Sequence, residues 1–222
     1  MIDRLKILLQ NKEEEKLLAF IQEQPEVLSM KDDNGSSGIL LIAYGGSTSV
    51  FSSAIALKTS FTFHEAIVCG KLDLVEEQLI NQQFKDINTH SEDGFSPIAL
   101  AAFFERIAIV KLLLKHGADP NLAAKNPSKV NALHAAVAKE NYALAQFLLQ
   151  NGARPNTTQI QAVTPLHAAV HRGNLALTKL LISYKASPSL KMDNGDTPLA
   201  IAEREGHKAI ATYLKNHTNT EN

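Results

Sequence analysis

The chain has very little cysteine. Cys69 is its only cysteine, so no disulfide can form within the chain. A zinc site built on several thiolates is excluded for the same reason. A single free thiol is typical of a protein kept in a reducing compartment.

An excess of charge of one sign and long hydrophobic runs are also missing. The 22 Lys and Arg residues nearly balance the 23 Asp and Glu residues, which gives a formal net charge of −1. The chain therefore has no overall basic field to hold nucleic acid or anionic lipid, although a local patch is not excluded. No apolar run reaches the roughly 20 residues of a membrane-spanning helix.

What is present is the composition of a globular protein. The 222 residues are 45% hydrophobic and 20% charged, and this length predicts one domain or two small ones. Residues 1–6 are amphipathic and lead into a charged run at 12–16, which is not typical of a secretory signal. We therefore expect a cytoplasmic protein.

An internal repeat organises most of the chain. Similar hexapeptides stand at residues 96–101 (SPIALA), 131–136 (NALHAA), 164–169 (TPLHAA) and 197–202 (TPLAIA). A second block follows about seventeen residues later, at 113–121 (LLKHGADPN) and 148–156 (LLQNGARPN), with a fainter copy at 181–189. The hexapeptides thus recur every 33 to 35 residues, and a period of this length is typical of a stack of small structural units.

Each block has a mechanical interpretation. A Thr-Pro pair opens a helix because the hydroxyl accepts from an orphan backbone N–H and Pro has no N–H to lose. Gly173 and Gly206 fit a left-handed cap between two helices, and Gly117 or Gly152 ends the second helix. One unit is therefore two helices followed by an extended finger, and it must stack on its neighbours to bury its apolar face.

These motifs resemble those of the ankyrin repeat family. The Thr-Pro-Leu-His string at 164–167 and the Gly-Ala-Asp-Pro-Asn string at 117–121 carry the resemblance, which covers about residues 60–215. The resemblance implies an all-α solenoid of about seven stacked helix-turn-helix pairs with short β-hairpin or turn fingers.

The N-terminal quarter follows the pattern less closely. Residues 61–66 (FTFHEA) fit the first block, and residues 32–40 resemble a degenerate finger and helix start. The interval from Gly38 to Thr62 is nine residues short of a full repeat, so we predict a shortened finger. Residues 2–24 form a further helix pair, broken near Asn11 and Lys12, with its Lys/Glu-rich side facing water. We therefore expect degenerate pairs acting as a cap at 1–59, regular repeats at 60–215 and a polar flexible tail at 216–222.

Two features depart from the family pattern. Glu105 and Glu140 occupy positions where the family usually has the capping glycine, so either the turn differs there or the chain tolerates a left-handed glutamate. Residues 124 and 125 are an insertion that lengthens one finger.

Few residues in the sequence suggest a catalytic, metal-binding or phosphate-binding site. His64, His134 and His167 share one repeat position. This suggests either a row of histidines for metal binding or proton transfer or, as in the family, hydrogen bonds from each ring to the backbone. Ala99 and Ala200 occupy the same position in other repeats and favour the second interpretation. His167 and His171 have a zinc-compatible spacing, but Ala168 stands where a metalloprotease has Glu. Cys69 is not cleanly paired with His64, and the small-residue loops at 34–38 and 45–48 lack a phosphate-binding pattern. We expect no catalytic residues, metal or cofactor.

The remaining function is recognition. The resemblance implies that partners lie against the finger tips and the first helix of each pair, on the concave side. The family pattern maps this side, and the candidate partner-binding residues taken from it are Phe95, Phe103, Phe104, Val130, Lys139, Ile160, Val163, His171, Arg172 and Arg204.

Two clusters within this set stand out. Phe95, Phe103 and Phe104 predict an aromatic anchor, although Phe103 and Phe104 would alternatively cover the gap at the shortened finger. A basic line at Lys139, His171, Arg172, Lys191 and Arg204, extended by Arg154, suggests an acidic partner segment or, alternatively, a solvated face.

The sequence thus predicts a non-catalytic, monomeric interaction module that binds a protein or peptide, with no nucleic-acid or membrane ligand. Two alternatives stay open. One is a structural role by self-association through the N-terminal quarter. The other is a metal or enzyme site using His64, Cys69, His167 or His171.

Overall fold

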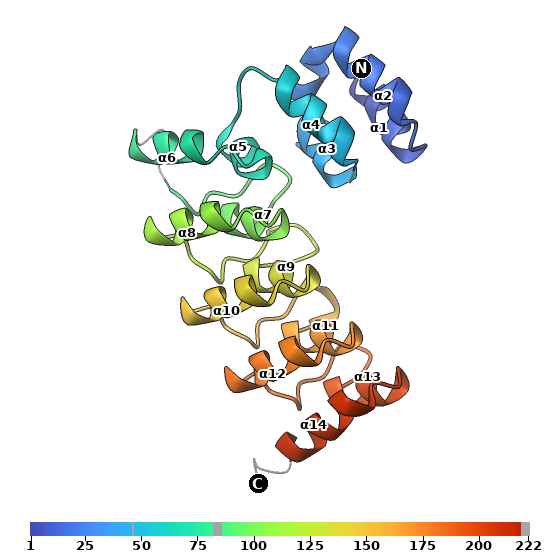
Figure 1. The fold of residues 1–222 in the computed structure, drawn as a ribbon, viewed down its shortest axis with the longest axis vertical. Coiled ribbons are helices and arrows are strands. Elements are labelled where there is room, and N and C mark those ends of the chain that lie inside the picture. The colour runs from blue at the N-terminus through green and yellow to red at the C-terminus, as the bar shows by residue number, and fades with distance from the viewer. Residues whose placement is uncertain (46, 82–85, 219–222) are drawn as a thin grey trace. The chain divides into compact units, whose positions relative to one another are not determined.

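The computed structural model describes residues 1–45, 47–81 and 86–218. Across these ranges the helices come in seven successive pairs, as predicted (Figure 1). The pairs are α1 (Ile2–Gln10) with α2 (Glu14–Glu23), α3 (Gly38–Gly45) with α4 (Thr48–Leu57), α5 (Phe63–Cys69) with α6 (Leu72–Ile80), α7 (Pro97–Phe103) with α8 (Ile107–Lys115), α9 (Ala132–Ala138) with α10 (Tyr142–Gln150), α11 (Pro165–His171) with α12 (Leu175–Ser183), and α13 (Pro198–Arg204) with α14 (Lys208–Thr218).

The connections between pairs are turns and short 3₁₀ helices. The 3₁₀ helices are η1 (Pro25–Ser29) and η2 (Ile160–Ala162). Within the described ranges no β-strand forms, and the finger ahead of α3 contains an isolated antiparallel bridge between Lys31 and Ser37. The predicted all-α class is therefore confirmed, with fingers made of turns.

The helices divide into two compact units. The first contains the described residues before Asp86 together with Ser91–Asp93, and the second contains Asp86–His90 and the described residues from Gly94 onward. Helices α5 and α6, which the sequence groups with the regular repeats, thus pack in the first unit. The predicted division at 59/60 concerns the regularity of the repeats and stays a prediction.

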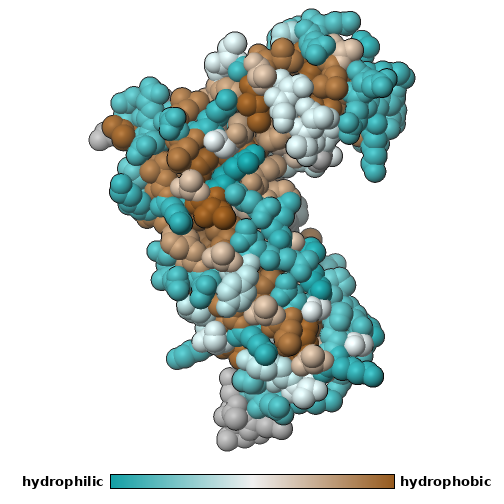
Figure 2. Space-filling view, viewed as in Figure 1, coloured by the Kyte–Doolittle hydropathy of each residue, from teal (hydrophilic) through white to brown (hydrophobic). Residues whose placement is uncertain are grey.

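The first unit is built on one apolar cluster. Leu5, Phe20 and Ile21 are at most 2% exposed, and η1 adds Val27 and Leu28. The break in the first pair falls where the sequence predicts it, because Lys12 adopts a left-handed φ of 56° between α1 and α2. The charged residues of this pair face water as predicted, and Figure 2 shows hydrophilic side chains over it.

A buried ion pair closes the shortened finger. Four residues, 58–61, separate the end of α4 from Thr62, the N-cap of α5. Lys58 Nζ lies 3.4 Å from Glu65 Oε1, and both side chains are at most 5% exposed. The same ammonium group donates to Ser29 Oγ at 2.5 Å and to the Leu28 carbonyl at 3.4 Å. The short connection is thereby fixed against η1.

The second unit repeats one capping device four times. Ser96, Asn131, Thr164 and Thr197 are the N-caps of α7, α9, α11 and α13, and each side chain accepts from the backbone N–H three residues on. These first helices pack on one another in sequence order, and α10, α12 and α14 do the same (Figure 1). Small residues such as Ala136 and Ala169, both fully buried, permit this close approach.

The two unusual glutamates are tolerated in the left-handed conformation. Glu105 and Glu140 have φ values of 54° and 53°, comparable to 67° at Gly173 and 76° at Gly206. The amide of Asn141 donates to Glu105 Oε1 at 2.9 Å, and that of Asn174 donates to Glu140 Oε2 at 3.0 Å. The turn geometry is therefore kept, and each glutamate gains a contact to the next pair.

Two local predictions have clear outcomes. The insertion at 124 and 125 lengthens its finger, where the Ala124 N–H donates to the Val130 carbonyl and the Lys125 N–H to the Gly94 carbonyl, each at 2.8 Å. Gly35 has a φ of 81°, as the predicted turn at 34–38 requires. Helix α14 continues to Thr218, past the predicted start of the polar tail at 216, and the flexibility of this tail stays a prediction. Residues 219–222, and residue 46 of the loop at 45–48, lie outside the described residues.

Candidate binding surface

The candidate residues lie at the ends of first helices and on fingers, all in the second unit. Phe103 is the last residue of α7 and His171 that of α11, while Lys139 and Arg172 are the C-caps of α9 and α11. Arg204 ends α13. The exposed members of the set are Phe103, Lys139, Ile160, His171, Arg172 and Arg204, and the half-buried members are Phe95, Phe104, Val130 and Val163.

An aromatic pair occupies the α7 end of this surface. The rings of Phe103 and Phe104 are 5.2 Å apart at an interplanar angle of 80°, an edge-to-face arrangement. Phe103 is 39% exposed, and Lys139 Nζ lies 4.3 Å from the centre of its ring. A cation over an aromatic face is attractive, so Lys139 of the next pair is held beside Phe103. The alternative role of the two rings at the shortened finger stays a prediction.

A groove of about 390 Å³ lies at the other end of the surface, between α11, α13 and the fingers before them. Four of the candidate residues line it: Val163, His171, Arg172 and Arg204. The other lining residues are Ala138, Gln159, His167, Ala168, Met192, Asn194, Asp196, Ile201 and Glu205. Phe95, Phe103, Phe104, Val130, Lys139 and Ile160 do not belong to this lining.

The sequence pattern did not identify two of the apolar residues that line the groove. Ile201 belongs to the hexapeptide at 197–202, whose apolar residues the pattern assigns to the core, and it is both 3% exposed and part of the groove wall. Met192 precedes the turn at Asn194 and Gly195, and its position in the finger gave no signal beyond that turn.

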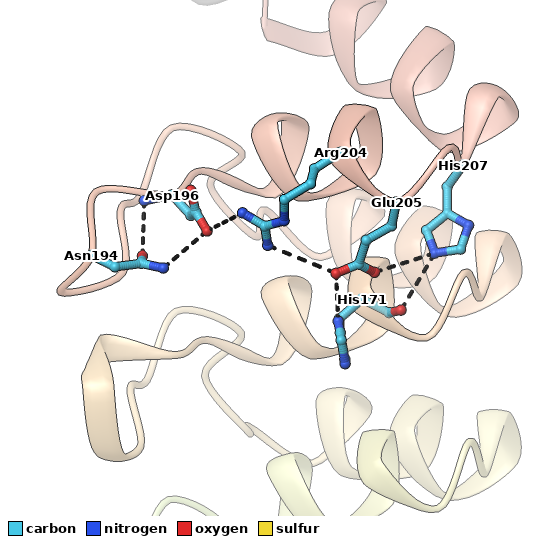
Figure 3. Close-up of polar contacts among 6 residues, drawn as sticks. All are labelled: His171, Asn194, Asp196, Arg204, Glu205 and His207. Carbon is cyan, nitrogen blue, oxygen red and sulfur yellow. Dashed lines mark hydrogen bonds and ion pairs between the residues drawn. The ribbon is translucent and has the colours of Figure 1, made fainter.

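Arg204 is the centre of a polar network at this groove (Figure 3). Its guanidinium lies 2.5 Å from Asp196 Oδ2 and 3.7 Å from Glu205 Oε1, and the Asn194 amide also donates to Asp196 at 3.0 Å. The hydrogen bond from Arg204 lowers the pKa of Asp196, and the same contact raises the pKa of Arg204. Both groups are therefore held in their charged forms.

Glu205 contacts two histidines on the other side of the same network. His171 Nδ1 lies 2.8 Å from Glu205 Oε1, and His207 Nε2 lies 3.5 Å from Glu205 Oε2 (Figure 3). Arg172 lies 3.8 Å from Glu140. The predicted basic line is thus interleaved with carboxylates at His171, Arg172 and Arg204, a pairing that the sequence pattern did not indicate.

The buried histidines serve structure. His167 Nδ1 accepts from the Thr164 backbone N–H at 3.2 Å, and its Nε2 donates to the Leu190 carbonyl at 3.1 Å, so the ring pins α11 to the next finger. Burial lowers the pKa of His167, and it lowers the pKa of His134 to about 4, partly opposed by the backbone of Val163 and Thr157. The backbone-bonding interpretation is confirmed for His167.

Neither a metal site nor an exposed thiol is found in the part of the chain that the structure covers. No three His, Cys, Asp or Glu side chains there converge as a metal site would require. Cys69 is 8% exposed and joins the apolar cluster of the first unit. None of the described helices is long and apolar enough to cross a bilayer.

Comparison with known proteins decides the family. A family model described as "Ankyrin repeats (3 copies)" matches residues 63–159 and 133–222, well over half of the chain. The chain belongs to the ankyrin repeat family. Ankyrin repeats generally mediate protein–protein interaction, and the family is generally non-enzymatic.

Similar individual proteins cover a shorter stretch. Over 74 residues, 33% of this chain, it is 35% identical to the human "DNA-binding protein RFXANK", of which the match covers 28%. Over the same length it is 34% identical to "Ankyrin repeat family A protein 2" from Bos taurus and from Homo sapiens, with 23% of each covered. The ankyrin array thus matches about a quarter of the length of these relatives.

Proposed function

We propose that this ankyrin repeat protein is a non-catalytic interaction module that binds a protein or peptide on the candidate surface of the second unit. The proposal extends to a monomer acting in the cytoplasm without a nucleic-acid or membrane ligand. The net charge of −1 favours this choice of ligand, because nucleic acids and anionic membranes attract basic surfaces.

One observation carries the proposal. Four successive helix pairs contribute their first-helix ends to the same set, and these ends carry both an exposed aromatic ring at Phe103 and a groove of about 390 Å³. Exposed aromatic side chains are frequent anchors of protein interfaces, and a mainly apolar concave site with a few polar groups is typical of ligand binding.

The test is affinity capture from the native cell, with captured proteins quantified by mass spectrometry. We expect the Phe103→Ala/Arg172→Glu variant to lose at least one protein that the unaltered chain retains. Matched changes outside the surface are Tyr142→Ala, at a ring 43% exposed on α10, and Lys208→Glu, at the first turn of α14.

The Tyr142→Ala/Lys208→Glu variant should retain the same proteins. If both double variants capture the same set as the unaltered chain, the candidate surface is not where partners bind. Circular dichroism of each variant ensures that a lost partner does not reflect a lost fold.

A further inference from the structure

The chemistry of the surface narrows the kind of segment that it fits, provided that the proposed function holds. We infer that it recognises a protein segment in which an acidic residue stands close to a large apolar one. The carboxylate binds between Lys139 and Arg172, and the apolar side chain enters the groove lined by Val163, Met192 and Ile201.

The two carboxylates that line the groove are already paired with cations. Asp196 is paired with Arg204, and Glu205 is contacted by Arg204, His171 and His207. A charged guest would have to compete with these contacts, and burying an unpaired charge is unfavourable. Much of the remaining wall is apolar, with Ala138, Val163, Ala168, Met192 and Ile201, so the groove favours an apolar guest.

Two cations beside the groove are available to an acidic partner. Lys139 is exposed, and its described contact is the ring of Phe103; among the described residues no carboxylate lies within ion-pair distance of it. Arg172 lies 3.8 Å from Glu140, with the two side chains 42% and 48% exposed. Exposed pairs at such distances contribute little, so a partner carboxylate can displace Glu140 at small cost.

The two cations occupy equivalent places in consecutive pairs. Lys139 is the C-cap of α9 and Arg172 the C-cap of α11, and these two helices pack against each other. Both Arg172 and Ala138, the neighbour of Lys139, line the groove. An acidic side chain next to an apolar one in the same extended segment can therefore reach both features, and the match of charges favours it.

The test uses the full chain and a display library of random twelve-residue peptides. Among selected peptides we expect Asp or Glu to be enriched within two positions of Leu, Ile, Met or Phe. Fluorescence anisotropy of individual selected peptides should show at least tenfold weaker binding to Lys139→Glu and to Arg172→Glu, with no change for Lys208→Glu. Replacing the acidic residue of the peptide by Lys should restore binding to the Lys139→Glu/Arg172→Glu variant.

The outcomes separate this inference from the proposed function. Peptides that lose binding with Phe103→Ala, yet lack acidic enrichment and ignore both charge reversals, would overturn the inference and leave the proposed function standing. Peptides that are insensitive to Phe103→Ala and to both reversals would count against both. Loss of binding without rescue by the Lys-substituted peptide would also overturn the inference, because charge then does not determine recognition.

Discussion

At the scale of the residue, His134 and His167 occupy equivalent positions in consecutive ankyrin repeats. Both side chains are almost fully enclosed, at 3% and 1% exposure of the residue, and burial favours the neutral imidazole. His134 hydrogen-bonds the N-cap Asn131, with His134 Nδ1 2.8 Å from Asn131 Oδ1. Burial makes the charged form of this ring unfavourable, so protonation of His134 works against the fold.

The pKa of His134 predicts how stability changes with pH. Its folded-state pKa of about 4 lies below the unfolded value near 6.5, so the unfolded chain binds the extra proton in this interval. The contribution of the neutral His134 ring to the free energy of unfolding is fully present above pH 6.5 and is lost as pH falls toward 4. We expect His134→Ala to remove roughly 3 kcal/mol of the pH dependence of unfolding.

The measurement is urea unfolding of the unaltered chain and of His134→Ala at several values between pH 7.5 and pH 4. Alanine is a suitable replacement because Ala99 and Ala200 fill the same repeat position. Ile160→Ala, at a side chain that is 50% exposed and does not titrate, is the comparison variant and should leave the pH dependence nearly unchanged. Identical pH profiles for all three proteins would contradict the assignment.

Single positions show how far the sequence alone reaches. The repeat pattern located Phe103, His171, Arg172 and Arg204 on first-helix ends, because a periodic sequence assigns equivalent positions directly. It left two options for Glu105, since a non-glycine residue is strained in the left-handed region and the local sequence does not show whether the chain accepts that strain. The pairing of Arg204 with Asp196 depends on the finger turn that brings the two together, which no local pattern specifies.

At the scale of the element, the connection between α4 and α5 combines a short loop with a buried ion pair. Lys58 is the C-cap of α4, donates to η1 and lies beside Glu65 of α5, so its ammonium group links these three elements. Removing one partner of such a pair leaves an uncompensated buried charge. The sequence predicted the shortening of this finger but not the ion pair. The carbonyl of Leu28 and the hydroxyl of Ser29 are distant from Lys58 in the sequence, and only the folded chain brings them to its ammonium group.

We predict that Lys58→Met destabilises the first unit by about 3 kcal/mol or more. Lys58→Met/Glu65→Gln should recover part of this loss, since the buried carboxylate is then neutral. Lys71→Met is the matched control: Lys71 is exposed, and its ammonium lies 5.4 Å from the ring of Phe61, which Lys58 also approaches at 5.9 Å. Denaturant unfolding of the full chain gives the three values, and equal losses for Lys58→Met and Lys71→Met would disprove the role of burial.

At the scale of the whole molecule, stability in the second unit depends on contacts between neighbouring pairs. Helix α11 packs against α9, α12 and α13, while α7 packs against α8 and α9. A solenoid of this kind has no single centre, so a local defect weakens adjacent pairs most. The repeat spacing predicts this order of packing from sequence. It does not predict that α5 and α6 pack with the first unit, because the hexapeptide at 61–66 looks regular.

Leu166→Ala should therefore produce a graded loss of protection. Leu166 in α11 is fully buried, and truncating such a leucine costs about 2–5 kcal/mol. We expect hydrogen exchange, read by mass spectrometry, to accelerate most in α9, α11, α12 and α13 and less in α7 and α8. Ile160→Ala, at a side chain 50% exposed, should leave the exchange pattern unchanged. A uniform acceleration from α7 to α14 would mean that the second unit opens as one cooperative block.

The amide contacts of Asn141 with Glu105 and of Asn174 with Glu140 have a consequence for how such an array changes over generations. Each of these residues is matched to a residue one pair earlier, whereas Gly173 has no side chain and faces His207 instead. A tandem duplication of α11 and α12 would set a second Asn174 amide opposite Gly173, with no carboxylate to receive it. Pairs of this array are thus not interchangeable at this contact, and unequal crossover inside it would place residues opposite each other that do not form it.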